Sequence, residues 1–172
     1  MIEVLLATYN GEAFLAEQIN SVLGQEGAEL RILVRDDGSS DKTPLVLEKY
    51  ARDHPEKISL LRSPGRLGGR GSFSWLLNQA RAPYVAFCDQ DDVWVAGKLC
   101  RLLTHMQSLE ARLGHDTPIL VHSDLAVVDR GLHPIHPSFW TYSGIDPTRN
   151  GLGQILIKNP VTGCALLANR AL

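Results

Sequence analysis

Short aliphatic runs alternate with amphipathic segments along the chain, and this alternation restricts the fold more than any other feature. The apolar runs cover residues 2–7, 30–34, 58–61, 84–88, 119–128 and 161–167. Most of the segments between them carry apolar residues at helical spacing, as residues 12–23 and 97–112 show. Such continuous runs are typical of strands buried on both faces, as in a parallel sheet. The sequence therefore predicts an α/β fold with right-handed crossovers.

Two stretches show neither the pattern of a buried strand nor the spacing of a helix, and we expect both to be loops. Ser63–Gly71 is too rich in glycine for regular structure. Gly131–Gly153 combines prolines with aromatic residues and is expected to form a long functional loop or flap. Its aromatic residues Phe139, Trp140 and Tyr142 would either stack on a sugar or pack the loop itself.

Size and charge exclude several classes of protein. A chain of 172 residues fits one domain, so residues 1–172 are expected to share one core. Lys and Arg total 17 against 19 Asp and Glu, and no long basic run could neutralise a phosphate backbone. Nucleic acid is therefore not an expected partner.

Cysteine usage and hydropathy indicate the compartment. The cysteines Cys88, Cys100 and Cys164 lack C-x-x-C spacing, which predicts buried thiols in a reducing compartment rather than disulfides or a zinc site. The first residues do not form a signal peptide, and no apolar run reaches the roughly 18 residues of a membrane span. We expect a cytoplasmic protein, and leave open peripheral association with the inner face of the membrane and a homo-oligomer formed through an exposed sheet edge at residues 161–167.

Three carboxylates directly follow a buried run in the segment Asp89–Gln90–Asp91–Asp92. Their mutual repulsion costs stability unless a cation offsets it. Oxygen ligands favour Mg²⁺, Mn²⁺ or Ca²⁺ over Zn²⁺, and such ions commonly bridge carboxylates and substrate phosphates. The segment thus predicts a metal site for a phosphorylated ligand, and the alternative is a solvated acidic turn that caps the next helix.

Two other polar segments are expected at the same edge of the sheet, because ligands bind beyond the carboxyl ends of parallel strands. The segment Asp36–Asp41 offers carboxylates to a base imide or a ribose hydroxyl, although its composition also suits an ordinary turn. The glycine-rich loop carries Arg66 and Arg70, either of which could bring a guanidinium to a diphosphate. It is not a dinucleotide fingerprint, because its glycines follow the third strand.

The order of these motifs resembles glycosyltransferase family 2, which has the GT-A fold. The resemblance is carried by Ala7–Thr8–Tyr9–Asn10, Asp36–Asp37–Gly38–Ser39–Ser40–Asp41 and Phe87–Cys88–Asp89–Gln90–Asp91–Asp92–Val93–Trp94. His122–Ser123–Asp124–Leu125 and Asn159–Pro160–Val161–Thr162–Gly163–Cys164 are similar to the bacterial rhamnosyltransferase-like branch. The resemblance covers essentially the whole chain and implies a Rossmann-like, mostly parallel sheet flanked by helices.

The resemblance implies roles for the residues that would bind the nucleotide. Ala7 and Tyr9 would flank the base, and Asp37 would accept a hydrogen bond from its imide nitrogen. Asp36 would support that contact, and Arg70 would lie near the diphosphate.

The resemblance also implies roles for the acidic segment. Asp89–Gln90–Asp91 would be the D-x-D motif, with Asp91 as the direct ligand of Mn²⁺ or Mg²⁺. Asp89 would lie near the ribose and the metal, and Gln90 would lie on the nucleotide side. Asp92 and Trp94 would face the acceptor or hold the geometry of the motif.

Two departures from the family's pattern stand out. No proline follows Trp94, which is expected to loosen the start of the next helix. The family's general base lies in a later motif, so we expect the chain to be incomplete at its C-terminus and to lack the base. Asp124 is the one inner candidate for that role.

The resemblance implies metal-dependent, inverting transfer of a sugar from dTDP-rhamnose or a UDP-sugar to a glycan or lipid-linked acceptor in cell-surface polysaccharide synthesis. One alternative is a non-catalytic fragment that binds nucleotide sugars. Another is a phosphotransferase of the haloacid dehalogenase type, which the spacing Asp89-x-Asp91-x-Val93 superficially matches. That motif normally ends the first strand, however, and the only lysines downstream are Lys98 and Lys158.

Overall fold

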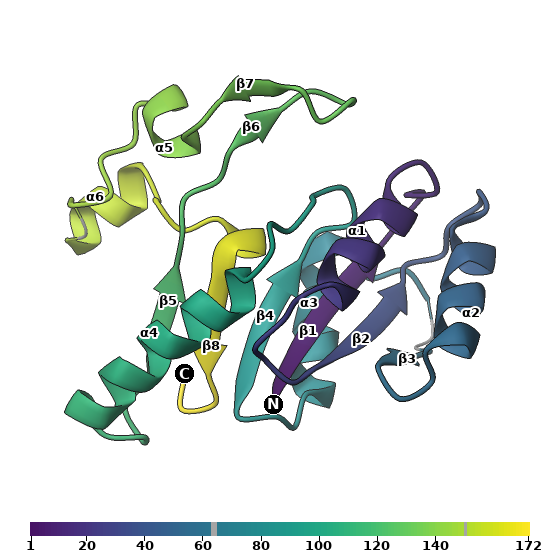
Figure 1. Ribbon diagram of the computed structural model, residues 1–172, viewed down its shortest axis with the longest axis horizontal. Coiled ribbons are helices and arrows are strands. Elements are labelled where there is room, and N and C mark those ends of the chain that lie inside the picture. Colours follow the sequence, from purple (N-terminus) through teal and green to yellow (C-terminus); the bar gives the residue numbers. More distant parts are fainter. Residues whose placement is uncertain (63–64, 150) are drawn as a thin grey trace.

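The computed structural model describes residues 1–62, 65–149 and 151–172. Helices cover both faces of a six-stranded sheet, and a two-stranded sheet lies apart from it, above β5 in the view of Figure 1. The large sheet has the order β3-β2-β1-β4-β8-β5. Its strands are β1 (Ile2–Thr8), β2 (Leu30–Asp36), β3 (Ile58–Leu60), β4 (Tyr84–Cys88), β5 (Leu120–His122) and β8 (Leu166–Asn169). The expected α/β class is confirmed.

The remaining elements complete the helical layers and the small sheet. The helices are α1 (Leu15–Leu23), α2 (Thr43–Asp53), α3 (Gly68–Gln79), α4 (Lys98–Leu113), α5 (Phe139–Tyr142) and α6 (Leu152–Ile157). The small sheet pairs β6 (Val127–Val128) with β7 (Pro134–His136). A 3₁₀ turn at Gly163–Ala165 leads into β8.

Strand register decides which loops meet. β1 pairs in parallel with β2 and with β4, so that Thr8 lies opposite Asp36 and Leu6 lies opposite Cys88. The three strands therefore end at the same edge of the sheet. β8 runs antiparallel between β4 and β5, and it brings the 163–165 turn to that edge as well.

The core has two parts, one on each face of the sheet. Ile2, Val4 and Leu6 of β1 pack into a larger cluster with residues of α1, α2 and α4. Leu5 points to the other face and packs with Leu76 of α3. These side chains are fully buried, and each contributes about 1.5–3 kcal/mol by leaving water. This core fixes the strand ends that carry the polar segments.

Several predicted boundaries were wrong. The glycine-rich segment is not a loop throughout, because α3 begins at Gly68; Ser63 and Pro64 lie outside the described residues. Gly68 has a φ of +68°, a conformation that glycine adopts at little cost. The run 119–128 was expected to be one strand interrupted at His122–Ser123–Asp124. The chain does break there, but the two parts, β5 and β6, belong to different sheets. The expected flap 131–153 contains β7, α5 and the start of α6, and its Asn150 lies outside the described residues.

The end of the chain also differs from the prediction. The last strand is Leu166–Asn169 rather than residues 161–167, and it lies inside the sheet. The exposed edge expected there is absent, because β5 covers it, so the reason given for self-association does not hold. Cys88 and Cys164 are buried free thiols as expected, whereas Cys100 is only half-buried. Within the described residues, no helix is long and apolar enough to cross a membrane.

Candidate functional site

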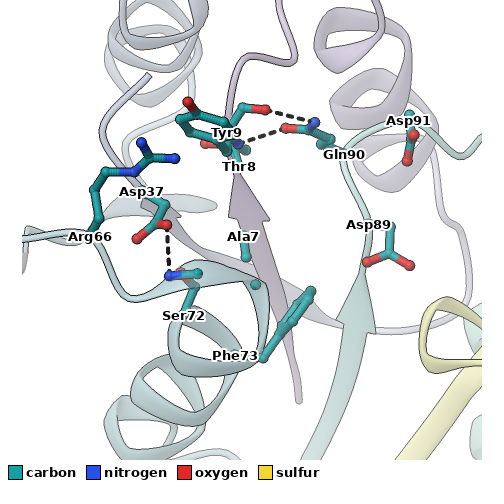
Figure 2. A pocket seen from close by; sticks show the side chains of 12 residues that line it. Ala7, Thr8, Tyr9, Asp37, Arg66, Ser72, Phe73, Asp89, Gln90 and Asp91 are labelled. Atoms are coloured by element: carbon teal, nitrogen blue, oxygen red, sulfur yellow. Dashed lines mark hydrogen bonds between the residues drawn. The ribbon is translucent and has the colours of Figure 1, made fainter. Parts of the chain in front are cut away.

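A cavity of about 300 Å³ opens where β1, β2 and β4 end, beside the first turn of α3 (Figure 2). It is lined by Ala7, Thr8, Tyr9, Asp37, Arg66, Gly68, Gly69, Ser72, Phe73, Asp89, Gln90 and Asp91. Six of the residues predicted for the site therefore share one cavity, which we call the strand-end cavity. Asp36 lies beside it, whereas Arg70, Asp92 and Trp94 do not line it.

Gln90 ties the end of β1 to the loop after β4. Its side-chain oxygen accepts a hydrogen bond from the Tyr9 amide at 2.8 Å, and its side-chain nitrogen donates to the Tyr9 carbonyl at 3.1 Å. A Cβ at Gly11 would lie 2.4 Å from that same oxygen. Glycine at position 11 thus leaves room for this reciprocal pair, which holds two walls of the cavity together; a Cβ there would displace the end of the Gln90 side chain.

Arg66 is the arginine that reaches the cavity. Its guanidinium carbon lies 4.2 Å from the centre of the Tyr9 ring, a cation–π distance. Arg70 lies in the first turn of α3 and is exposed. Both arginines belong to one glycine-rich segment of the sequence. Arg66 precedes the start of α3 at Gly68, whereas Arg70 lies within that helix.

The two aspartates at the end of β2, Asp36 and Asp37, have different roles. Asp36 accepts hydrogen bonds from the Thr8 hydroxyl at 2.9 Å, the Ser39 hydroxyl at 2.6 Å and the amides of Gly38 and Ser39. It therefore holds the turn in place, as a supporting role would require.

Asp37 is buried and faces the cavity. Its Oδ1 accepts from Arg35 and from the Leu67 amide, both at 2.6 Å, and its Oδ2 accepts from the Gly68 amide at 2.8 Å. Burial alone would raise the pKa of Asp37, but these hydrogen bonds and the Arg35 charge lower it to about 2. A carboxylate has about four lone-pair sites, so Oδ2 keeps one for a ligand N–H.

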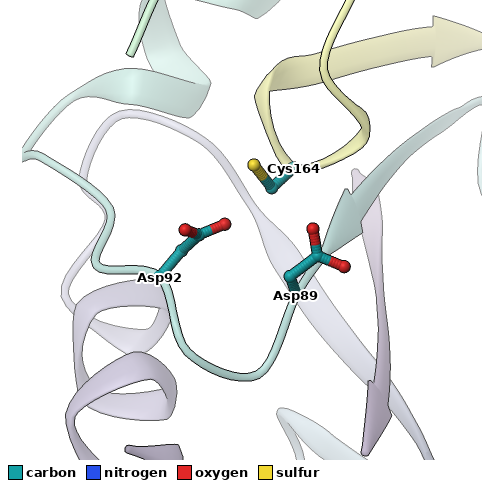
Figure 3. A group of neighbouring side chains, drawn as sticks. All are labelled: Asp89, Asp92 and Cys164. Carbon is teal, nitrogen blue, oxygen red and sulfur yellow. The ribbon is translucent and has the colours of Figure 1, made fainter. Parts of the chain in front are cut away.

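The acidic loop after β4 brings like charges together. Ligand atoms of Asp89, Asp92 and Cys164 lie within 4.8 Å of one another (Figure 3). Burial, and then the charges of Asp92 and Asp91, raise the pKa of Asp89. Asp91 is exposed and is not part of this group. Asp91 and Asp89 offer the oxygen ligands that a divalent cation prefers, and such an ion would relieve the repulsion. The chemistry of these carboxylates therefore fits the expected metal, although the group brought together by the structure holds Asp89 and Asp92 and leaves out Asp91, the predicted direct ligand.

A buried lysine lies beneath the acidic loop. Lys98 donates to the carbonyl of Cys164, and its ammonium lies 3.8 Å from the centre of the Trp94 ring. Burial lowers its pKa to about 8, against the opposing charges of Asp92 and Asp89. Trp94 is itself buried, so of its two predicted roles the structural one matches its position. No sequence signal pointed to this role, because α4 begins only at Lys98 and its spacing from Trp94 is therefore not a helical one.

A second cavity, of about 490 Å³, lies on the other side of Asp91, between α1, the acidic loop and the segment that carries β6. Asp91 and Asp92 both line it. Asp124, the candidate base, lines neither cavity. It accepts hydrogen bonds from the amides of Leu125 at 2.8 Å and Trp140 at 3.1 Å, and such bonds outweigh burial and lower its pKa. Its geometry is that of a residue that holds the start of α5.

Comparison with known proteins agrees with this geometry. The sequence model of glycosyl transferase family 2 matches residues 3–172. The chain is 35% identical over 98 residues to the dTDP-rhamnosyl transferase RfbG of Shigella flexneri, which covers 55% of this chain and 34% of that protein. It is 33% identical over 99 residues to the UDP-Glc:alpha-D-GlcNAc-diphosphoundecaprenol beta-1,3-glucosyltransferase WfgD of Escherichia coli, covering 58% of this chain and 38% of that protein.

A solved structure is similar as well. The mannosyltransferase PcManGT from Pyrobaculum calidifontis, in complex with GDP-Man and Mn²⁺, superposes with a TM-score of 0.54 at 25% identity and covers 59% of this chain and 31% of that one. The match thus spans about a third of the length of each of these three proteins.

Proposed function

The chain belongs to glycosyltransferase family 2, and from this premise we propose that its strand-end cavity binds a nucleoside-diphosphate sugar for transfer to an acceptor in bacterial surface-polysaccharide synthesis. One observation carries the proposal: the ends of β1, β2 and β4 bring Tyr9, Asp37 and Asp91 to one cavity. These residues offer a ring for a base, an acceptor for an imide and a carboxylate for a metal–diphosphate.

The base would lie at the Asp37 end of the cavity. The free lone pair of Asp37 Oδ2 suits the imide N–H of uracil or thymine, and Tyr9, held by Gln90 and Arg66, provides an aromatic face. The donor would thus be a UDP- or dTDP-sugar. The named donors of the two bacterial relatives, dTDP-rhamnose and UDP-glucose, are of this kind.

The diphosphate would lie at the Asp91 end. Asp91 and Asp89 would hold Mn²⁺ or Mg²⁺, which supplies positive charge against the negative charge of the departing nucleoside diphosphate. Lys98 would keep the loop in place by joining it to the 163–165 turn. In the proposed inverting reaction, an acceptor hydroxyl forms a bond to the anomeric carbon from the face opposite the diphosphate, whose bond to that carbon breaks, and the hydroxyl proton passes to a carboxylate.

The acceptor would be a glycan or a lipid-linked sugar, and the protein would act at the inner face of the membrane. WfgD is named for an acceptor linked to diphosphoundecaprenol. The exposed side chains of Leu152, Leu156 and Ile157 on α6 support peripheral contact with lipid.

A thermal-shift panel tests the proposal. UDP, dTDP, GDP and ADP are each added with and without Mn²⁺, and a ligand at about 100 times its dissociation constant should stabilise the fold by about 2.7 kcal/mol. We expect UDP or dTDP with Mn²⁺ to raise the melting temperature most. A panel without any stabilising nucleotide would contradict the proposal, and stabilisation without turnover on any acceptor would favour the non-catalytic binding fragment.

A further inference from the structure

The second cavity has an apolar wall and an acidic wall. Phe14 stands at the start of α1, and Phe139 begins α5; both line it together with aliphatic residues of the segment 125–132. This combination of apolar surface and a few polar groups is typical of a site for an organic ligand. Its volume of about 490 Å³ lies in the range of such sites.

Asp91 lines both cavities, so the second cavity begins where the strand-end cavity ends. If a donor occupies the strand-end cavity as proposed above, its diphosphate lies at Asp91. A molecule in the second cavity would then approach the donor from the side of Asp91 and Asp92. The second cavity is therefore in the position that an acceptor needs, and this inference rests on the proposed function.

The charges of the second cavity restrict what it can hold. Its lining includes four carboxylates, Glu17, Asp91, Asp92 and Asp129, against one guanidinium, Arg130, which leaves a formal charge of −3 before a metal–diphosphate binds at Asp91. A phosphate group there would meet strong repulsion, because like charges at short range destabilise each other. Carboxylates instead accept hydrogen bonds from hydroxyl groups readily.

We propose that the second cavity binds an uncharged sugar ring of the acceptor and keeps any phosphate of that acceptor outside. The apolar side chains, Phe14 and Phe139 among them, would cover the ring's C–H faces, and the carboxylates would accept its hydroxyl protons in hydrogen bonds. An acceptor linked to a lipid diphosphate would then present its sugar to the cavity while its diphosphate stays in solvent or at the membrane.

Glu17 is the carboxylate of this cavity best placed to receive a sugar hydroxyl. Asp129 already accepts hydrogen bonds from the amides of Gly131 at 2.8 Å and His133 at 2.9 Å, which hold the turn before β7. Asp92 contacts the thiol of Cys164, and Asp91 faces the donor side as well. Glu17, in the first turn of α1, has no hydrogen bond or ion pair within the described residues.

Saturation-transfer NMR with a matched pair of ligands tests the inference. The chain is mixed with methyl α-D-glucopyranoside or with α-D-glucose 1-phosphate at about 10 mM, which reaches millimolar dissociation constants. Both samples contain UDP and Mg²⁺, and a second pair uses the corresponding N-acetylglucosamine compounds. We expect saturation of the neutral glycosides and at least about tenfold weaker binding of the phosphates.

Three variants locate the signal. Ala126→Trp should fill the cavity and abolish saturation of the glycosides, whereas Ala111→Trp, at an exposed position of α4 that lines neither cavity, should leave it unchanged. Glu17→Lys changes the formal charge of the lining from −3 to −1 and should raise the binding of glucose 1-phosphate relative to the glycoside. Unchanged circular dichroism shows that each variant is folded.

The outcomes separate this inference from the proposed function. Saturation of UDP in the same samples reports on the strand-end cavity, so its absence would contradict the proposed function. With UDP bound, equal or stronger binding of the sugar phosphates would overturn the inference. An undiminished glycoside signal in Ala126→Trp, or no glycoside signal from the unaltered chain, would overturn it too.

Discussion

Replacing Asp37 by Asn removes a buried negative charge while it keeps the shape of the side chain. The Asp37 carboxylate pairs with Arg35 at 2.6 Å, and Arg35 is fully buried. The substitution removes the carboxylate that pairs with this guanidinium. It also turns an amide NH₂ toward donors, either toward the Gly68 amide or toward Arg35 and the Leu67 amide. Breaking a buried pair on one side costs about 3–5 kcal/mol, so we expect the free energy of unfolding to fall by about 3 kcal/mol at pH 7.

The pH dependence gives an independent estimate of the same effect. The pKa of Asp37 lies at about 2 against an ordinary value of 3.8. A difference of about two pKa units at 1.36 kcal/mol each corresponds to about 2–3 kcal/mol of stability. Because the pKa is lowered in the folded chain, this contribution is complete above about pH 5 and is lost as the pH falls toward 2. About half of it should be gone at pH 3.

Urea unfolding followed by circular dichroism at pH 7, 5 and 3 measures both the effect of the substitution on the free energy of unfolding and the pH dependence of that free energy. The matched control is Asp53→Asn, which breaks an exposed pair with Lys49 and should change stability little at any of these pH values. Two results together would refute the reasoning: a loss of less than about 1 kcal/mol in the free energy of unfolding for Asp37→Asn at pH 7, and a difference in that free energy between the unaltered chain and the variant that is no smaller at pH 3.

Three further substitutions test how the site is held together. Gly11→Ala places a Cβ 2.4 Å from the Gln90 side-chain oxygen and should break the Tyr9–Gln90 pair at a cost of about 1 kcal/mol in the unfolding free energy; unchanged stability and UDP affinity would contradict this. Arg66→Ala should weaken UDP binding, measured by calorimetry, about two- to fivefold, whereas Arg70→Ala should not. A larger effect of Arg70→Ala would favour the prediction that Arg70 lies near the diphosphate. Lys98→Met should lower the unfolding free energy by about 1–3 kcal/mol, while Lys158→Met, at an exposed position, should change it little; equal effects would show that the buried ammonium is unimportant.

Much of the fold could be predicted because its strands are continuous apolar runs. The run at residues 84–88 became β4 without any shift, and the parallel pairing of β1, β2 and β4 follows from their burial on both faces. The position of β8 could not be read from the sequence, because a short apolar run carries no information about its direction or neighbours. The start of α3 was missed because glycine disfavours helices, whereas here the Gly68 amide is held by Asp37.

The candidate site was predictable where one rule applied to several residues at once. Parallel strands end at one edge, so Tyr9, Asp37 and Asp91 could be expected to converge. Side-chain choices within a loop were not predictable in this way. Arg66 lies just before the start of α3 and Arg70 lies in its first turn, and this boundary decides which of them reaches the cavity. The second cavity depends on where residues 125–139 lie relative to α1.

In the proposed complex, Asp91 holds a metal–diphosphate at the end of the strand-end cavity. Calorimetric titration of UDP into the chain with and without Mn²⁺ tests it, with Asp91→Ala as the variant and the exposed Asp116→Ala as the control. We predict that Mn²⁺ strengthens UDP binding in the unaltered chain and in Asp116→Ala, because the diphosphate and the carboxylates otherwise repel each other, and that Asp91→Ala abolishes this gain. The same Mn²⁺-dependent affinity in Asp91→Ala would contradict the claim.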